Sequence, residues 1–244
     1  MARSYYPTED TFLNASRGLV KGAEVRNIFG KAANTTSIVT TEFRVPWEEP
    51  RDYTFPTSEL TMQAVSTSTS DTAVTLLIKG LDINFLEVEA VVSLTGTTPT
   101  VITSQDFFRI NDVLELSGQA VGNVTISSGG VVYARVNAGR GRNQAAVFTV
   151  PAGHCFYLYR IDAYSTDSNG GKSSIFRNEV GNNKTGTVFR VAETQFFVNM
   201  NIQRRFPFKY DEKSDVKLQL KSSSGSIDGS VFAEGLLLSE PIQG

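Results

Sequence analysis

The chain of 244 residues has few of the side chains on which metal and catalytic sites most often depend. It contains a single cysteine, Cys155, and a single histidine, His154. One cysteine cannot form an intrachain disulfide, and these two side chains cannot complete a four-ligand zinc site. The composition therefore predicts no bound metal and no cofactor.

An excess of charge of one sign is also absent. The chain has 23 Lys and Arg against 25 Asp and Glu, a formal net charge of -2 at pH 7. Proteins that bind nucleic acid mainly through phosphates carry a clear excess of positive charge on the binding surface. The charge balance therefore predicts no nucleic-acid partner.

Long apolar runs are missing as well. The longest stretches, residues 74–78 and 236–238, fall far short of the roughly 20 residues that a membrane-spanning helix requires. The first ten residues lack the basic and apolar regions of a secretory signal. We therefore expect no membrane partner, and folding in a reducing cytoplasm, where an unpaired Cys155 is ordinary.

Short runs with a period of two dominate the remaining sequence. Residues 86–94 place Leu, Val, Ala, Val and Leu on one face and mostly polar side chains on the other, as in a half-buried strand. Segments rich in Gly, Pro, Asn and Ser separate such runs and supply turn conformations. The same pattern occurs in residues 59–66, 107–116, 123–127, 131–137, 145–150, 155–164, 186–191, 196–202, 216–220 and 229–238.

These runs follow one another at about ten-residue spacing, with no helix-length pattern between them. The missing crossover helices exclude a parallel α/β fold. We therefore predict an all-β protein, an antiparallel β-sandwich or jelly roll with an extended N-terminal arm.

Three regions are predicted along the chain. Residues 1–35 have neither a clean helix nor a clean strand period and are expected to form the N-terminal arm. Residues 36–165 are expected to form the β-sandwich core. Residues 166–244 follow a polar, Gly-rich segment and either complete the sandwich or form a small second β-domain.

No group of residues predicts a catalytic site. His154 and Cys155 are adjacent in a predicted strand, so their side chains point to opposite faces and cannot act as a base and nucleophile pair. Glu87 and Glu89 share one face and have the residue type used in glycoside hydrolysis, but solvated surface charge explains them more simply. We therefore expect no catalytic residue and no enzymatic activity.

Several side chains are candidates for contact with partner molecules. Aromatic residues in the arm would dock on a neighbour, and those in the proline-framed segment 46–56 would pack on the core, on a neighbouring subunit or on a sugar ring. Two arginines in a Gly-rich turn would either remain solvated or meet an acidic partner surface. The candidates are Tyr5, Tyr6, Phe12, Trp47, Tyr53, Phe55, Arg140 and Arg142.

An ordered set of short motifs points to a family. The motifs are Asn27-Ile28-Phe29-Gly30, Val45-Pro46-Trp47, Tyr53-Thr54-Phe55-Pro56, and residues 65–72, 78–85, 94–98, 107–110, 122–126 and 149–154. In this order and spacing they resemble a family of small virion structural proteins encoded by tailed bacteriophages, especially marine ones. The resemblance covers residues 25–160.

The resemblance implies a non-enzymatic β-sandwich that is made in the host cytoplasm and assembled into the virion. It would act as a capsid-associated decoration or as a component of the neck or tail, forming homo-oligomers and contacting the major capsid, neck or tail proteins. The alternative is a carbohydrate- or receptor-binding module of the phage particle, which would contact a host surface glycan. The resemblance brings no catalytic residue.

Overall fold

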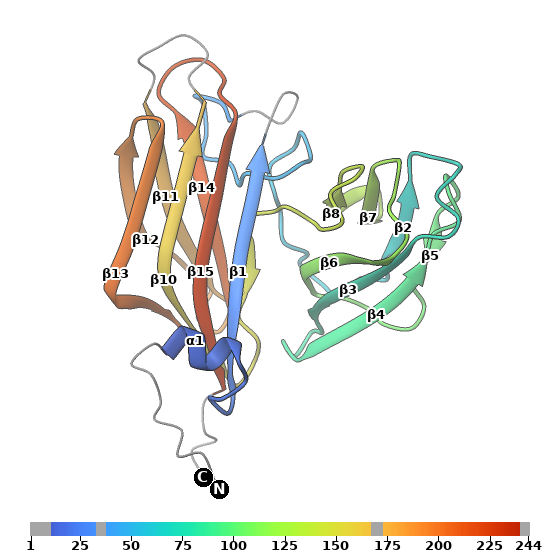
Figure 1. Cartoon of the computed structure of the whole chain (residues 1–244), viewed down its shortest axis with the longest axis horizontal. Helices are drawn as coiled ribbons and strands as arrows, with labels where there is room; N and C mark the ends of the chain where they lie inside the picture. Colours follow the sequence, from blue (N-terminus) through green and yellow to red (C-terminus); the bar gives the residue numbers. More distant parts are fainter. Residues whose placement is uncertain (1–10, 33–37, 167–172, 240–244) are drawn as a thin grey trace, which may run out of the picture.

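The computed structural model describes residues 11–32, 38–166 and 173–239 of the chain. Within them, antiparallel strands form two β-sandwiches that lie next to each other (Figure 1). The helix α1(Thr11–Ser16) precedes the first strand. The structure confirms the predicted all-β antiparallel fold. Among the described residues, no helix combines the length and the apolar composition needed to cross a membrane.

The larger sandwich is a jelly roll. Its sheets have the strand orders β1-β15-β10-β13 and β12-β11-β14-β9. Counted along the chain, these strands are the first to the eighth of the sandwich, so the sheets read 1-8-3-6 and 5-4-7-2, as in a jelly roll built from two Greek keys. The strands are β1(Ala23–Ala32), β9(Val147–Thr149), β10(His154–Ser165), β11(Ser174–Asn182), β12(Thr187–Phe196), β13(Asn199–Tyr210), β14(Ser214–Ser222) and β15(Gly229–Ser239).

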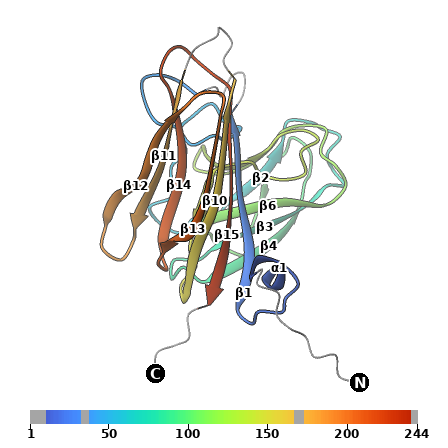
Figure 2. The same ribbon diagram turned by 60° about the vertical axis from the view of Figure 1, so that its left-hand side comes forward.

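The smaller sandwich is inserted between β1 and β9 of the jelly roll. Its sheets have the orders β5-β2-β7-β8 and β4-β3-β6, and it lies on the β1 side of the jelly roll (Figures 1 and 2). We call it the inserted sandwich. Its strands are β2(Gln63–Ser66), β3(Thr75–Leu81), β4(Glu87–Ser93), β5(Thr100–Val101), β6(Arg109–Ser117), β7(Val124–Ser128) and β8(Val131–Val136).

Each sandwich has its own hydrophobic core between its two sheets. The jelly-roll core combines Ile28 of β1 with Phe156 of β10 and Leu218 of β14. The core of the inserted sandwich joins Ile78 of β3 to Ile126 of β7. Two separate cores in one chain are the usual mark of two folding units.

The structure divides the chain differently from the predicted boundaries. Residues 23–32 were expected in an arm, but β1 pairs with β15 over its whole length, from Ala23 with Leu238 to Ala32 with Gly229. The expected core, residues 36–165, contains the whole inserted sandwich and also jelly-roll strands. The strands after residue 166 complete the jelly roll. An alternating pattern shows that one face of a strand is buried, but it does not show which strand is the pairing partner. The pattern therefore cannot reveal that one sandwich is inserted into another.

Candidate functional site

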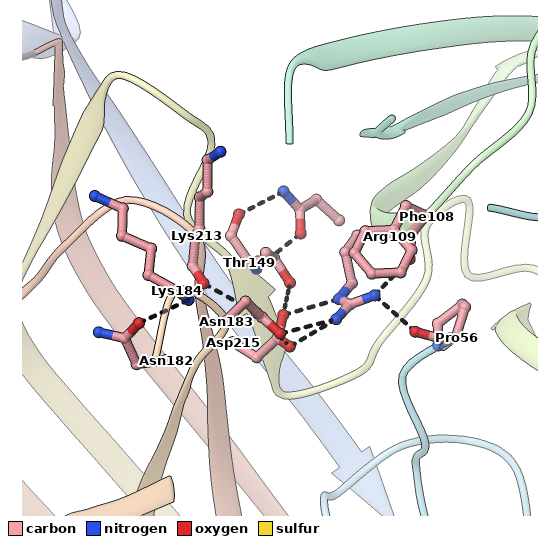
Figure 3. Close-up of polar contacts among 10 residues, drawn as sticks. Pro56, Phe108, Arg109, Thr149, Asn182, Asn183, Lys184, Lys213 and Asp215 are labelled. Carbon is pink, nitrogen blue, oxygen red and sulfur yellow. Dashed lines mark hydrogen bonds and ion pairs between the residues drawn. The ribbon is translucent and has the colours of Figure 1, made fainter. Parts of the chain in front are cut away.

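A buried ion pair connects the two sandwiches. Arg109, the first residue of β6, reaches from the inserted sandwich to Asp215 of β14 in the jelly roll (Figure 3). The guanidinium Nε and Nη2 each donate to one carboxylate oxygen at 2.9 Å, which is a bidentate pair. The two side chains are only 4% and 10% exposed, so water does not screen the interaction.

The polar atoms around this ion pair form hydrogen bonds with one another. Arg109 Nη1 also donates to the carbonyl oxygens of Pro56 and Phe108, both at 2.8 Å. Asp215 accepts further hydrogen bonds from Thr149 Oγ1 at 2.6 Å and Asn183 Nδ2 at 2.9 Å. The carboxylate is therefore saturated by the chain itself, and this junction has the geometry of a structural lock rather than of a ligand site.

Aromatic rings enclose the same guanidinium. Its carbon lies 3.9 Å from the ring centroid of Phe108 and 4.9 Å from that of Phe55. Phe108 in turn packs edge-on against Phe85, whose carbonyl accepts a hydrogen bond from the N–H of Ala152 in the jelly roll. Cation–π contacts with a buried guanidinium strengthen the hold of the ion pair. The junction thus fixes the orientation of the inserted sandwich.

A polar cleft of about 350 Å³ lies between the sandwiches. Four ion pairs line it: Arg26 with both Glu24 and Glu87, Lys79 with Glu89, and Arg142 with Asp112. Within the described ranges, no group of three or more His, Cys, Asp or Glu side chains is arranged to hold a metal ion. The cleft walls are charged on both sides and offer little apolar surface to a small ligand.

The most exposed apolar side chains of the jelly roll lie along one side of it. They belong to β12 and β13, the outermost strands of the two sheets on that side, and to the turn that joins them (Figure 1). Phe206 is 75% exposed, the largest value among these side chains. We call this surface the β12–β13 edge and define it by Val188, Phe189, Arg190, Phe197, Val198, Arg204, Arg205 and Phe206.

A bulge in β13 places Phe206 in solvent. Leu158 of β10 pairs with Phe208 and Arg160 pairs with Gln203, so residues 204–207 oppose Tyr159 alone. The extra residues leave the sheet and project outward, as bulges at sheet edges do. Arg204 stabilises this shape because its Nε donates to the Phe206 carbonyl at 3.0 Å. Pro207 lacks an N–H and so suits an edge strand.

The charge of the β12–β13 edge is positive. Arg204 lies over the ring of Phe208, with its guanidinium carbon 4.1 Å from the centroid, and Arg205 lies 5.9 Å from the Phe206 centroid. Among the described residues, neither arginine forms an ion pair. An exposed aromatic side chain next to arginines is the composition found at the centre of protein interfaces.

The structure selects one of the alternatives for two aromatic candidates. Trp47 and Tyr53 are 2% and 1% exposed and belong to the jelly-roll core. Trp47 Nε1 donates to the carbonyl of Arg51 at 2.5 Å, which closes the proline-framed loop on itself. Phe55 is partly buried against the same core and touches the junction. These rings therefore pack on their own chain, and neither Trp47 nor Tyr53 can serve as a platform for a sugar or a partner.

The other contact candidates have different positions. Tyr5 and Tyr6 lie outside the described residues. Phe12 of α1 packs edge-on against Tyr159 of β10, with centroids 4.4 Å apart. Arg140 lies 3.8 Å from Glu48, a carboxylate whose pKa is raised by burial. Arg142 pairs with Asp112, so the chain itself supplies an acid to each of the two exposed arginines.

Sequence reasoning did not find the two features that define the site. Arg109 was read only as part of a motif, because nothing in a sequence links residues 106 positions apart. The segment Arg204-Arg205-Phe206-Pro207 did carry a local signal, since a proline inside a strand pattern indicates an edge or a bulge. Only the register with β10 shows that this segment leaves the sheet.

Comparisons with known proteins identify no family. No family model matches the sequence, and no curated protein matches it. Among solved structures, a chain of the infectious bursal disease virus Gx strain aligns with 9% identity and a TM-score of 0.24, covering 89% of this chain and 72% of the viral one. A chain of the T=1 particles derived from the same virus aligns with 10% identity and a TM-score of 0.21, covering 91% and 75%.

Proposed function

We propose that this chain is a non-enzymatic structural subunit of a tailed-phage virion that docks as a repeated unit on the capsid, neck or tail. The observation that carries the proposal is the β12–β13 edge, an exposed apolar and cationic surface on a jelly roll. Monomeric proteins seldom leave an aromatic side chain as exposed as Phe206 beside others of its kind unless a partner covers them.

The fixed junction supports the same proposal. A repeated subunit has to present its surfaces in one relative orientation, and the lock of Arg109 and Asp215 holds the inserted sandwich against the jelly roll. Closed assemblies depend on such constant geometry, because a small angular error accumulates from one subunit to the next. The motif resemblance of residues 25–160 to tailed-phage virion proteins supports a tailed-phage virion as the type of particle.

Quantitative mass spectrometry of density-purified particles of the phage that encodes the chain tests the proposal. We expect the chain to co-purify with the particles at a constant ratio to the major capsid protein. A copy number close to that of the capsid protein would indicate a decoration of the shell, and a much lower one the neck or tail. Absence of the chain from purified particles would overturn the proposal.

A further inference from the structure

The chain carries a second exposed surface whose chemistry complements the β12–β13 edge. It lies around the β3–β4 hairpin of the inserted sandwich and combines apolar side chains with carboxylates. We call it the β3–β4 face and define it by Glu59, Asp82, Ile83, Leu86, Glu87, Glu89 and Val91.

The strand period places part of this face on one side of β4. Glu87, Glu89 and Val91 alternate with the inward-facing Val88, Ala90 and Val92, so their side chains share the outer surface of the sheet. In the turn before β4, Asp82 Oδ1 accepts the N–H groups of Asn84 and Leu86 at 2.8 and 2.9 Å, which shapes the turn. The exposed Ile83 and Leu86 belong to this turn.

The carboxylates form the outer layer of the β3–β4 face. Glu87 pairs with Arg26 and Glu89 with Lys79, and in both pairs the acid is more exposed than the base, 49% against 24% and 56% against 35%. Both carboxylates border the cleft between the sandwiches, and about half of each side chain is open to solvent, so a partner can reach them. The β12–β13 edge offers the opposite charge, with Arg204 and Arg205 beside Phe206.

One molecule cannot join these two surfaces. Figure 1 places β12 and β13 on the side of the jelly roll that faces away from the inserted sandwich, which carries β3 and β4. The two surfaces can therefore meet only between copies. Because each copy would contribute a different surface to the contact, the association is head-to-tail, and such contacts close into rings or continue as filaments.

We infer that the β12–β13 edge of one copy docks on the β3–β4 face of a second copy, with Phe206 against Val91 and with Arg204 and Arg205 against Glu87 and Glu89. This inference deepens the proposed function by naming the partner of the docking surface. The contact is made by side chains rather than by strand addition, because the β13 bulge and Pro207 interrupt the backbone edge.

Charge reversal in the purified full-length chain tests the inference. The variants are Arg204→Glu with Arg205→Glu, Glu87→Lys with Glu89→Lys, and the combination of all four. Sedimentation velocity over a range of concentrations would measure self-association. We expect the wild-type chain to associate, each double variant to associate at least about tenfold more weakly, and the fourfold variant to recover, since it restores opposite charges across the contact.

Matched controls separate the contact from general charge effects. Arg51→Glu and Asp106→Lys reverse exposed charges outside both surfaces and should leave association unchanged. The variant Glu87→Gln with Glu89→Gln removes the two charges with little change in shape. It is used in place of Glu87→Lys with Glu89→Lys if circular dichroism shows that the lysine variant does not fold. Added salt should weaken wild-type association, because exposed charges are screened.

The outcomes distinguish this inference from the proposed function. A wild-type chain that stays monomeric at every concentration, or a folded fourfold variant that does not recover, would overturn the inference. A chain found in particles by mass spectrometry together with either of these results would leave the virion function standing without this contact. A restored fourfold variant of a chain absent from particles would support the contact and overturn the virion function.

Discussion

The two sandwiches build their cores from different side chains. The jelly roll has strands of up to 12 residues and a core rich in large rings, among them Trp47, Phe156, Phe176 and Tyr210. The inserted sandwich has strands of at most nine residues and a core of mostly aliphatic side chains. Each buried ring removes more apolar surface from water than an aliphatic side chain, so the jelly roll gains more stabilisation per core residue.

The inserted sandwich compensates with buried polar contacts. Asp71 is buried there and accepts hydrogen bonds from Ser66 Oγ at 2.5 Å and from the N–H groups of Val121 and Gly122 at 3.0 Å. It ties the segment after β2 to the segment before β7. The jelly roll is therefore a framework held by apolar packing, whereas the inserted sandwich depends on specific polar contacts, both internally and at the junction.

The largest expected effect comes from breaking the junction. Arg109→Ala leaves the carboxylate of Asp215 buried without its cation, which costs about 3–5 kcal/mol of unfolding free energy. In urea, Trp47 fluorescence reports on the jelly roll and far-ultraviolet circular dichroism on both sandwiches. We expect the two transitions to coincide in the wild type and to separate in the variant.

Arg142→Ala is the matched control for the junction. It removes a more exposed ion pair with Asp112 and should cost less than about 1 kcal/mol. The double variant Arg109→Ala with Asp215→Ala should recover part of the loss, because no buried charge remains unpaired. If Arg109→Ala proved as mild as Arg142→Ala, the sandwiches would not depend on this lock.

A smaller effect follows from overpacking each core separately. A Cβ added at Gly235 would lie 2.5 Å from ring carbons of Phe156 in the jelly roll, and one at Gly80 would lie 2.6 Å from Phe107 in the inserted sandwich. Gly235→Ala and Gly80→Ala should each cost about 1–3 kcal/mol. Hydrogen exchange should rise mainly in β10 and β15 for the first variant and mainly in β3 and β6 for the second.

Gly181→Ala serves as the control for this pair of variants. The nearest atom to an added Cβ there is 3.8 Å away, and the change should leave hydrogen exchange nearly unaltered. If hydrogen exchange rose equally in both sandwiches in either glycine variant, the two sandwiches would unfold as one cooperative unit. That result would contradict two separately stabilised sandwiches.

Acid should distinguish the sandwiches through Asp71. Burial acts to raise its pKa, but the hydrogen bonds from Ser66, Val121 and Gly122 outweigh burial and hold the pKa below its usual 3.8. A carboxyl group whose pKa is lower in the folded state than in the unfolded state stabilises the fold at pH values above its unfolded-state pKa. This stabilisation is lost as the pH falls through the folded-state pKa. The inserted sandwich should therefore lose stability below about pH 4.

Asp71→Asn tests this pH dependence. It should lower the free energy of unfolding by about 1–3 kcal/mol at pH 7, because the hydrogen-bond acceptors are changed, and should flatten the loss of stability between pH 4 and pH 2. Urea unfolding at several pH values measures both effects, with the exposed Asp106→Asn as the reference. An unchanged pH profile in Asp71→Asn would assign the acid sensitivity to other carboxylates.

The smallest effect on stability is expected at the β12–β13 edge. Phe206→Ser alters a solvent-exposed side chain and should change the free energy of unfolding by no more than about 0.5 kcal/mol. Sedimentation should nevertheless show weaker self-association. Val101→Ser, at an exposed apolar position on the inserted sandwich outside the β3–β4 face, should change neither property. If the two variants self-associated equally strongly, Phe206 would not take part in the contact.

Much of the secondary structure could be predicted because most strands are half-buried. The expected strand at residues 86–94 corresponds to β4, whose outer residues are exposed and inner residues buried as the period requires. The strand β11 escaped prediction. Two of its buried positions are polar, Ser174 and Asn178, and the Asn178 amide donates to the Tyr210 hydroxyl in the core. A buried polar residue that donates to a distant partner hides the hydrophobic period.

The strand β1 was missed for a different reason. The first half of β1 is partly exposed on both faces, so Ala23 to Asn27 show no alternation. Its place in the sheet comes from pairing with β15, about 200 positions away. Likewise, Trp47 and Tyr53 were open to several readings because an aromatic residue in a loop can cover its own core or a partner.

A fold of antiparallel strands could be predicted from the residues alone, because the period of two and the turn residues are local properties of the chain. The composition also limited the chemistry, since one histidine and one cysteine leave few catalytic arrangements. Three features are visible only in the folded chain: the nesting of the sandwiches, the lock of Arg109 with Asp215, and the display of Phe206 on a bulge. These depend on which distant segments meet, and hydrophobic burial favours contact without specifying the partner.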